Sequence, residues 1–325
     1  MTDAVIPIVD FGTYGLHVAN PGSVKREVLE DTATEICSAL STIGFVYLIN
    51  HGIEQSKIDD MFQSSKNFFT QPLEVKETCA RDKSVGNHGW VGLEVEKLNP
   101  DRPAGDLKEA FNFSPHEDGS WPSDTFRSTF FTFFNECKQL TMRVLDMLSI
   151  GLQLEDKNFL RECHNLIGKK GCATTLRSLY YPPLSGSVKP GQVRCGEHSD
   201  YGTVTLLFQD GIGGLEVMNT DDMAGYDMFQ VMNTDDVYVP AQPVPGAIVV
   251  NIGDLMQRWT ADKLKATKHR VLIPEAELRK HQSRQSVAFF VHPNDETIIR
   301  CLDGSDKYEP ISSIDYLNYR FSLTY

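Results

Sequence analysis

Two His-x-Asp triplets stand out in the sequence, because this pattern can present an imidazole and a carboxylate to one metal ion. His198-Ser-Asp200 directly precedes the extended run 201–208, whereas His116-Glu-Asp118 lies in a stretch rich in Pro, Gly and Ser. In a β-strand, residues i and i+2 point to the same side, so a strand would aim both side chains into one cavity. Stretches rich in Pro and Gly form turns, and we interpret the second triplet as a solvated loop. For the first triplet, a structural hydrogen bond between its histidine and aspartate is the alternative.

A third candidate ligand follows later in the chain. His269 stands at the start of the extended run 270–273, after a strand-like segment at 246–254. Two histidines and one carboxylate on one face of an octahedron leave positions open for a substrate group and dioxygen. This set suits non-haem Fe(II), and His269 can supply its third protein ligand.

Arg284 and Ser286 form a second pair with i and i+2 spacing, at the beginning of the apolar run 286–291. On a strand, their guanidinium and hydroxyl groups would point together into the interior. A buried guanidinium is costly unless it meets a carboxylate. That carboxylate belongs either to an Asp or Glu of the chain or to a dicarboxylic cosubstrate, which the guanidinium fork would bind through two hydrogen bonds.

The elements that position these residues change in type along the chain. Apolar spacing predicts helices over 25–43 and 56–69 and a long helix that begins after Pro122-Ser123-Asp124, with a buried strand at 45–50. From about residue 173 onward, short β-rich runs such as 203–208, 247–252 and 286–291 alternate with Gly, Pro and Asp. Several short strands with turn signals between them predict a sandwich, barrel or jelly roll.

Composition and missing motifs exclude several functional classes. The 325 residues carry 31 Lys and Arg against 44 Asp and Glu, a net charge of −13 that disfavours nucleic acid and anionic membranes as partners. Neither a long apolar span nor a basic secretory leader is present. The seven cysteines form no C-x-x-C pair, which favours reduced thiols and a cytoplasmic location. The absence of G-x-G-x-x-G, P-loop and G-x-S-x-G motifs leaves dinucleotide binding, P-loop chemistry and serine hydrolysis without support.

One hexapeptide, Val-Met-Asn-Thr-Asp-Asp, occurs at 217–222 and again at 231–236. A local duplication explains this identity, and the Asn- and Asp-rich composition predicts an enlarged loop between strands. A calcium-binding loop is the alternative, but the segment lacks the spacing of calcium ligands typical of such loops.

Taken in order, these motifs resemble the Fe(II)- and 2-oxoglutarate-dependent dioxygenases of the isopenicillin-N-synthase-like family. The resemblance rests on 198–200, 251–254, 268–271 and 284–286, and in the N-terminal half on 6–11, 43–53 and 107–113. It covers nearly the whole chain and implies a mixed α/β fold with a double-stranded β-helix (jelly-roll) core and flanking helices. We expect an N-terminal helical and strand region at 1–120, and a long helix, jelly-roll core and C-terminal helix at 121–325, in one compact unit.

The resemblance also assigns roles to residues. It implies that His198, Asp200 and His269 hold Fe(II), and that Arg284 and Ser286 bind the distal carboxylate of 2-oxoglutarate. Tyr181, in the run 179–183, corresponds to a tyrosine whose hydroxyl commonly joins them, whereas its neighbour Tyr180 is expected to pack. Ascorbate is a further possible cofactor. The duplicated segment makes the interval between Asp200 and His269 longer than is usual in the family.

Substrate contacts are less well indicated. By family position, the candidate pocket walls are Phe111, Phe113, Tyr201, Phe290 and His292. Simple core packing is the alternative for each of them, because aromatic side chains usually lie in cores. Arg177 is a further candidate, for an acidic substrate. The segment 316–321 is expected to form a closing helix without a chemical role.

The predicted function is oxidation of a small organic molecule. We expect an Fe(II)- and 2-oxoglutarate-dependent oxygenase that hydroxylates, desaturates or cyclises its substrate with dioxygen and releases succinate and CO2. A same-fold oxidase that does not use 2-oxoglutarate is one alternative. A non-catalytic jelly-roll binding protein is another, because metal ligands alone do not prove turnover. A zinc hydrolase is less consistent with a dicarboxylate site beside the metal.

Overall fold

The fold is described from a computed structural model, which covers residues 6–324 except 83, 85, 100, 101, 103, 185–190, 220–236 and 274–280. Its larger sheet has eight strands, in the order β1 (Ile8–Asp10), β2 (Phe45–Ile49), β10 (Ala247–Ile252), β7 (Val204–Gln209), β12 (Arg284–Val291), β5 (Thr175–Tyr181), β4 (Glu109–Phe113) and β3 (Gly89–Val91). A second sheet has the order β6 (Cys195–His198), β11 (His269–Val271), β8 (Leu215–Met218) and β9 (Tyr238–Pro240). A short pair, β13 (Ile298–Ile299) and β14 (Ile311–Ser312), lies outside both sheets.

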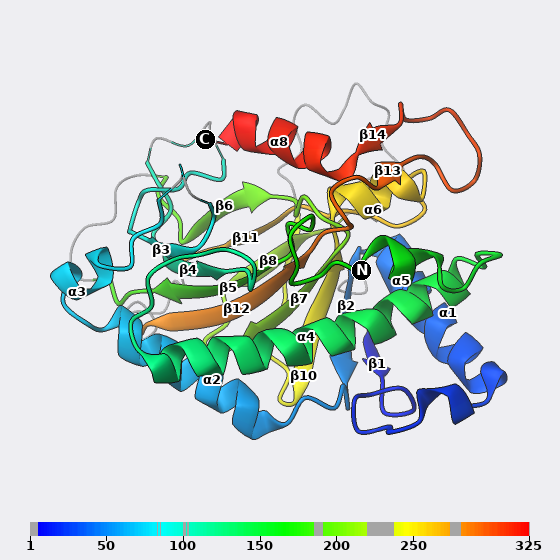
Figure 1. Cartoon of the computed structure of the whole chain (residues 1–325), viewed down its shortest axis with the longest axis horizontal. Coiled ribbons are helices and arrows are strands. Elements are labelled where there is room, and N and C mark those ends of the chain that lie inside the picture. Colours follow the sequence, from blue (N-terminus) through cyan, green and yellow to red (C-terminus); the bar gives the residue numbers. More distant parts are fainter. Residues whose placement is uncertain are drawn as a thin grey trace.

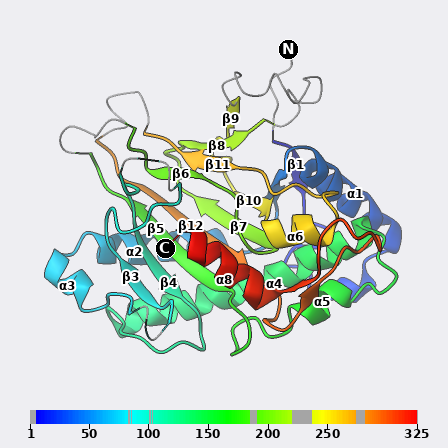
Figure 2. The same ribbon diagram turned by 90° about the horizontal axis from the view of Figure 1, so that it is seen from above.

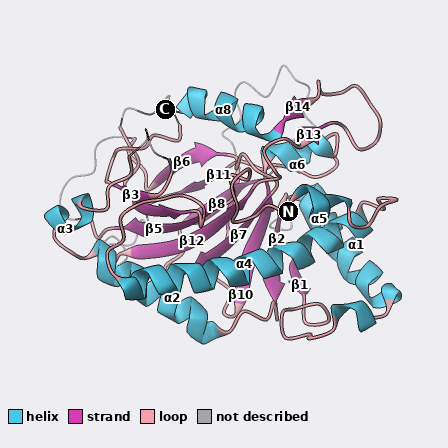
Figure 3. Cartoon of the chain, viewed as in Figure 1, coloured by secondary structure: helices cyan, strands magenta, loops and turns pink. Residues whose placement is uncertain are grey.

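The two sheets form the jelly-roll core. All pairs in the second sheet and all central pairs of the larger sheet are antiparallel, and only β1 joins its neighbour β2 in parallel. From β5 to β8 the chain alternates between the sheets, since β5 and β7 belong to the larger sheet and β6 and β8 to the second. Figure 2 shows the second sheet beside the larger one, and Figure 3 shows how helices surround the strands. The predicted jelly-roll fold is therefore confirmed.

Helices lie on both sides of the strands. They are α1 (Arg26–Thr42), α2 (Gln55–Phe69), α3 (Leu73–Glu77), α4 (Asp124–Gly151), α5 (Phe159–Cys163), α6 (Asp254–Trp259) and α8 (Ser313–Thr324), with a 3-10 turn at Pro21–Ser23. In Figure 1, α4 runs below the strands and α8 lies above them. None of the helices in the described ranges combines the length and apolar composition that a membrane span requires.

The long helix α4 has the predicted start and the predicted apolar stripe. The Ser123 side chain accepts a hydrogen bond from the Phe126 backbone N–H and so caps the first turn. The stripe that includes Phe130 and Phe134 is fully buried, and Phe134 contacts Phe289 of β12 at a centroid distance of 5.0 Å. Burial of this stripe fixes the larger sheet against α4 and leaves the other face of the sheet free to line a cavity.

The predicted helix at 25–43 and strand at 45–50 are also observed, as α1 and β2. Between them Gly44 has a φ of +76°, and a Cβ atom there would lie 2.3 Å from the Lys265 carbonyl oxygen and 2.4 Å from Thr267 Oγ1. Only glycine tolerates both the positive φ and this close approach. The turn thus brings the segment that leads into His269 against the N-terminal half of the chain.

The duplicated hexapeptide lies largely outside the described residues. Its first copy begins in β8, but residues 220–236, which include the whole second copy, are not described. The predicted enlarged loop between strands therefore stays a prediction.

Candidate functional site

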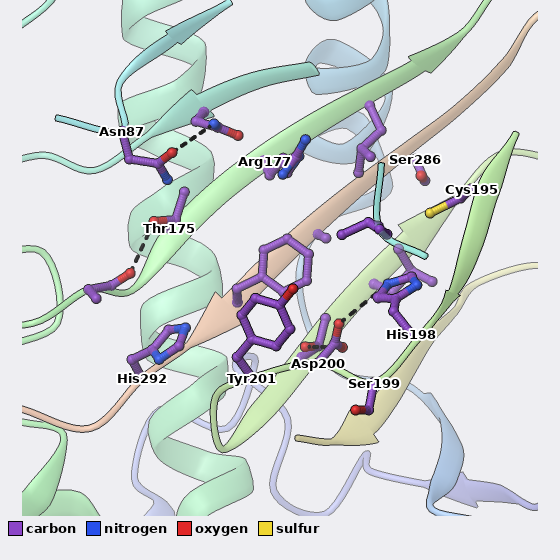
Figure 4. A pocket seen from close by; sticks show the side chains of 18 of the residues that line it. Asn87, Thr175, Arg177, Cys195, His198, Ser199, Asp200, Tyr201, Ser286 and His292 are labelled. Atoms are coloured by element: carbon purple, nitrogen blue, oxygen red, sulfur yellow. Dashed lines mark hydrogen bonds and ion pairs between the residues drawn. The ribbon is translucent and has the colours of Figure 1, made fainter. Parts of the chain in front are cut away.

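A cavity of about 550 Å³ opens inside the jelly roll. Strands of both sheets line it, and the inner face of α8 contributes Ile314, Leu317, Asn318 and Phe321. In the view of Figure 4, Asn87, Thr175 and His292 lie at one end, and His198 and Cys195 lie at the other. The volume is within the range of pockets that hold small-molecule ligands.

His198, Asp200 and His269 converge at one place in this cavity. Each offers one ligand atom, and these atoms lie within 4.8 Å of one another. Asp200 Oδ1 is 3.9 Å from His198 Nε2 and 3.8 Å from His269 Nε2. Both distances are too long for a hydrogen bond, so the alternative of a structural His–Asp hydrogen bond is wrong. The three atoms could instead share one metal ion.

Backbone carbonyl groups fix the orientation of both imidazoles. His198 Nδ1 donates to the Gly196 carbonyl oxygen at 2.8 Å, and His269 Nδ1 donates to the Thr267 carbonyl oxygen at 3.1 Å in the corresponding tautomer. This arrangement leaves Nε2 of each ring as a lone-pair donor directed toward Asp200. Such hydrogen bonds on the outer ring nitrogen are typical of histidines that bind metals.

The Asp200 carboxylate is oriented by two donors that the sequence analysis did not identify. Thr205 Oγ1 and Asn251 Nδ2 donate to Asp200 Oδ2 at 2.6 and 2.7 Å, which leaves Oδ1 for a ligand. Thr205 belongs to β7 and Asn251 to β10, and the two residues are register partners. Asp200 itself lies in the loop after β6, so the prediction that one strand would aim both His198 and Asp200 is wrong.

The ionisation of the three groups suits a divalent cation. Burial lowers the pKa of His269 to about 4, and burial also lowers the pKa of His198. Burial opposes ionisation of Asp200, but the two nearby imidazoles and the hydrogen bonds from Asn251 and Thr205 outweigh it and lower the pKa of this carboxyl. Neutral imidazoles and an ionised carboxylate are the forms that bind metal. Together they place one negative charge in a buried site, which attracts a cation.

The other triplet has no such surroundings. His116 is exposed and lies in a turn after β4, as expected for a solvated loop. Neither His116 nor Asp118 belongs to the metal-competent group found among the described residues.

The predicted cosubstrate residues also converge. Arg284 and Ser286 share one face of β12, and Arg284 Nη1 donates to Ser286 Oγ at 3.2 Å. Tyr181 is the register partner of Arg284 on β5, its ring lies 4.9 Å from the Arg284 guanidinium, and its hydroxyl shares a hydrogen bond with Ser286. The neighbouring Tyr180 points to the opposite face and stacks on Phe69 at 5.4 Å, as predicted.

The Arg284 guanidinium has only neutral protein partners in the described part of the chain. Besides Ser286, they are the Gly213 carbonyl oxygen at 2.8 Å and Gln209 Oε1 at 3.4 Å. Asp210 is nearby, but its carboxylate accepts from the backbone N–H groups of Gln285 and Ile212 instead. The sequence analysis left two sources open for the carboxylate that Arg284 needs, an Asp or Glu of the chain or a dicarboxylic cosubstrate. Because no described Asp or Glu pairs with Arg284, the structure favours the cosubstrate.

The substrate-wall predictions are correct in part. Tyr201, Phe290, His292 and Arg177 line the cavity. Phe111 and Phe113 do not, because they point to the other face of β4 and pack against aromatic residues of α4. Strand alternation explains the error: the residue between them, Asn112, is the one that faces the cavity.

Several lining residues were not identified from the sequence. They come from segments far apart in the chain: Asn87 before β3, Lys108 and Asn112 near β4, and Thr175 on β5. The C-terminal helix α8 had been given no role beyond closure, yet Leu317 and Phe321 reach the cavity. Only the i, i+3, i+4, i+7 spacing of 314, 317, 318 and 321 could have indicated a common inward face.

Comparison with known proteins agrees with this geometry. Residues 6–130 match the model of the non-haem dioxygenase in morphine synthesis N-terminal family, and residues 172–293 match the 2OG-Fe(II) oxygenase superfamily. Proline hydroxylase buaE of Petromyces alliaceus is 33% identical over 281 residues, which are 82% of this chain and 83% of that protein. The 2-oxoglutarate-dependent dioxygenase ecdK of Aspergillus rugulosus is 29% identical over 324 residues, covering 89% and 92% of the two chains.

Among solved structures, a full-length Neurospora crassa protein in complex with alpha-KG (2-oxoglutarate) superimposes with a TM-score of 0.83 and 31% identity. The alignment covers 100% of this chain and 98% of that one, and the same values hold for its complex with alpha-KG and thymine. Fold, site chemistry and relatives thus agree. The chain belongs to the 2OG-Fe(II) oxygenase superfamily and is an oxidoreductase that depends on Fe(II) and 2-oxoglutarate.

Proposed function

We propose that this protein hydroxylates a small organic molecule, with His198, Asp200 and His269 as the ligands of Fe(II). The observation that carries the assignment is that one ligand atom from each of the three side chains lies within 4.8 Å of the others. Nε2 of His198 and of His269 lies 3.9 and 3.8 Å from Asp200 Oδ1, and the remaining polar atoms of the three side chains are hydrogen-bonded. Desaturation or ring closure of the substrate would use the same site.

Arg284, Ser286 and Tyr181 would bind the distal carboxylate of 2-oxoglutarate. The Arg284 guanidinium, 1% exposed, would gain the carboxylate partner that the described residues do not provide. A charge-assisted hydrogen bond of this kind contributes about 1.5–3 kcal/mol. With its distal carboxylate on Arg284 and its keto acid on the metal, the cosubstrate would be held at both ends, so Arg284 would also fix its orientation.

When bound, Fe(II) with 2-oxoglutarate and dioxygen supplies the oxidising power: one oxygen atom enters a C–H bond of the substrate, and the other enters succinate as CO2 is released. The chain supplies positioning. The cavity walls would hold the target carbon near the metal, and α8 would limit the access of water through Leu317 and Phe321.

We also propose a cytoplasmic location, because all seven cysteines are unpaired.

The proposal is tested by anaerobic reconstitution. Addition of Fe(II) and then 2-oxoglutarate to the metal-free protein should produce the weak visible charge-transfer band of a 2-oxoglutarate–Fe(II) chelate. Asp200→Ala should lose iron, whereas Arg284→Ala should keep iron and lose the band at modest cosubstrate concentration. Arg143→Ala, which changes an arginine outside the cavity that contacts the Tyr14 and Val18 carbonyl oxygens, is the matched control. A wild-type protein that shows no band and forms no succinate in air would refute the proposal.

A further inference from the structure

The two ends of the cavity differ in how their cations are neutralised. At the cosubstrate end, Arg284 and the fully buried Arg194 have no carboxylate within ion-pair distance in the described ranges. Arg194 donates only to the Gln282 carbonyl oxygen, at 3.0 Å, and its Nε and Nη1 atoms have no described partner. This end is suited to an anionic ligand, as the dianion 2-oxoglutarate requires.

At the other end, which we call the substrate half and which includes Asn87, Asn112, Thr175, Arg177 and His292, a carboxylate of the chain already neutralises Arg177. The Arg177 guanidinium forms an ion pair with Glu96. Glu96 Oε2 also lies 3.7 Å from Nζ of Lys108, a residue nearer the Cys195 end of the cavity that is itself 2.5 Å from Asp106 Oδ2. Lys108 and both carboxylates are at most 3% exposed, so water does not weaken these pairs.

Arg81 and Glu117 also line the substrate half, and both contact Asn87. Arg81 Nη1 donates to Asn87 Oδ1 at 3.0 Å, and Glu117 Oε1 accepts from the Asn87 backbone N–H at 3.2 Å. These two side chains add one positive and one negative charge to the wall of this half. A ligand carboxylate buried here would compete with Glu96 for Arg177 and would lie in the same half as the Glu117 carboxylate, so its loss of hydration would be poorly offset.

Two uncharged groups of the substrate half do have buried atoms without a partner among the described residues. Asn112 uses Nδ2 to donate to Asn87 at 3.1 Å, but its acceptor Oδ1 is unpaired, and so is His292 Nδ1. Burial lowers the pKa of His292 to about 4, so its ring is neutral at neutral pH. Its backbone is fixed by a 2.9 Å hydrogen bond to Thr174 Oγ1, which holds the ring at the cavity wall. A buried polar atom without a partner destabilises the protein, and a ligand that supplies the missing hydrogen bond would recover that free energy.

We propose that the substrate half selects an uncharged molecule with an amide-type N–H and C=O, and rejects the corresponding free carboxylate. An N–H group of the ligand would donate to Asn112 Oδ1, and a second polar group would pair with the neutral ring of His292. The inference rests on the proposed function, because it assumes that 2-oxoglutarate takes the Arg284 end. It replaces the earlier suggestion that Arg177 serves an acidic substrate, since Glu96 already occupies that guanidinium.

The test uses isosteric amide and acid pairs as probes: nicotinamide and nicotinate, benzamide and benzoate, and N-acetylprolinamide and N-acetylproline. Each probe is titrated by calorimetry into the anaerobic Fe(II)–2-oxoglutarate complex. The wild-type protein should bind each amide at least about tenfold more tightly than its acid, which corresponds to about 1.4 kcal/mol. Equal affinities, tighter binding of the acids or no binding by any probe would overturn the inference.

A charge variant tests the reason for the preference. Glu96→Gln removes the counter-charge of Arg177 and should shift the amide-to-acid ratio by about tenfold toward the acid. Glu136→Gln is the matched control, because Glu136 pairs with Lys57 outside the cavity lining, and it should leave the ratio unchanged. An unchanged ratio in a folded Glu96→Gln protein would contradict the account, and if that variant does not fold, the wild-type ratios decide alone. The charge-transfer band is recorded in the same samples, so failure of the cosubstrate site is distinguished from failure of amide selection.

Discussion

Replacement of Asn251 by leucine should weaken iron binding although Asn251 is not itself a proposed ligand. The side chain is 2% exposed, and its Nδ2 atom donates to Asp200 Oδ2 at 2.7 Å. A hydrogen bond to a charged group contributes about 1.5–3 kcal/mol, and leucine has a similar size but no donor. Since 1.4 kcal/mol corresponds to a factor of ten, we expect the dissociation constant of Fe(II) to rise by roughly 10- to 100-fold.

The assay is anaerobic calorimetry with Fe(II), repeated with Mn(II), which does not oxidise in air. Asn112→Leu is the matched control, because Asn112 is equally buried and lines the same cavity but does not contact Asp200. Thr205→Val removes the other donor to the same oxygen and should give a similar loss. Unchanged metal affinity in Asn251→Leu, or an equal loss in Asn112→Leu, would refute the argument that these donors orient the carboxylate.

Three further outcomes are expected. Arg284→Met should raise the dissociation constant of 2-oxoglutarate by about 10- to 100-fold in titrations of the charge-transfer band, and should have little effect on 2-oxobutyrate, which lacks the distal carboxylate. Burial lowers the pKa of His51 and of His164 to about 4, below the roughly 6.5 of an unfolded chain, so the unfolded state binds more protons between these values. Urea unfolding should therefore show stability falling as the pH drops from about 6.5 to about 4, and a flat profile would contradict this. Phe130→Ala, in the fully buried stripe of α4, should lower the free energy of unfolding by about 3–5 kcal/mol, and a loss under 1 kcal/mol would contradict the packing described.

The sequence was most informative where a pattern is local. Apolar spacing predicted α1, α2 and α4 to within a few residues, because burial of one helix face requires that period. Strand alternation correctly placed Arg284 and Ser286 on one face of β12, and the same rule separated Tyr180 from Tyr181. These arguments need no knowledge of distant parts of the chain.

Contacts between distant segments were beyond this reasoning. Asn251 meets Asp200 only because β10 pairs with β7, and their register is set by sheet pairing rather than by either strand alone. Family position placed Phe111 and Phe113 at the cavity, but both lie in the core, and the sequence alone does not reveal which side of an isolated strand faces the cavity. The contribution of α8 to the cavity was missed for the same reason, because it depends on where the helix packs against the rest of the chain.

The most direct test of the metal assignment is a crystal structure of the protein grown with Fe(II) under nitrogen, with anomalous scattering recorded at the iron edge. The account predicts one strong anomalous peak bonded to His198 Nε2, His269 Nε2 and Asp200 Oδ1, with Oδ2 still hydrogen-bonded to Thr205 and Asn251. A peak elsewhere in the chain, or none at full iron loading, would contradict it.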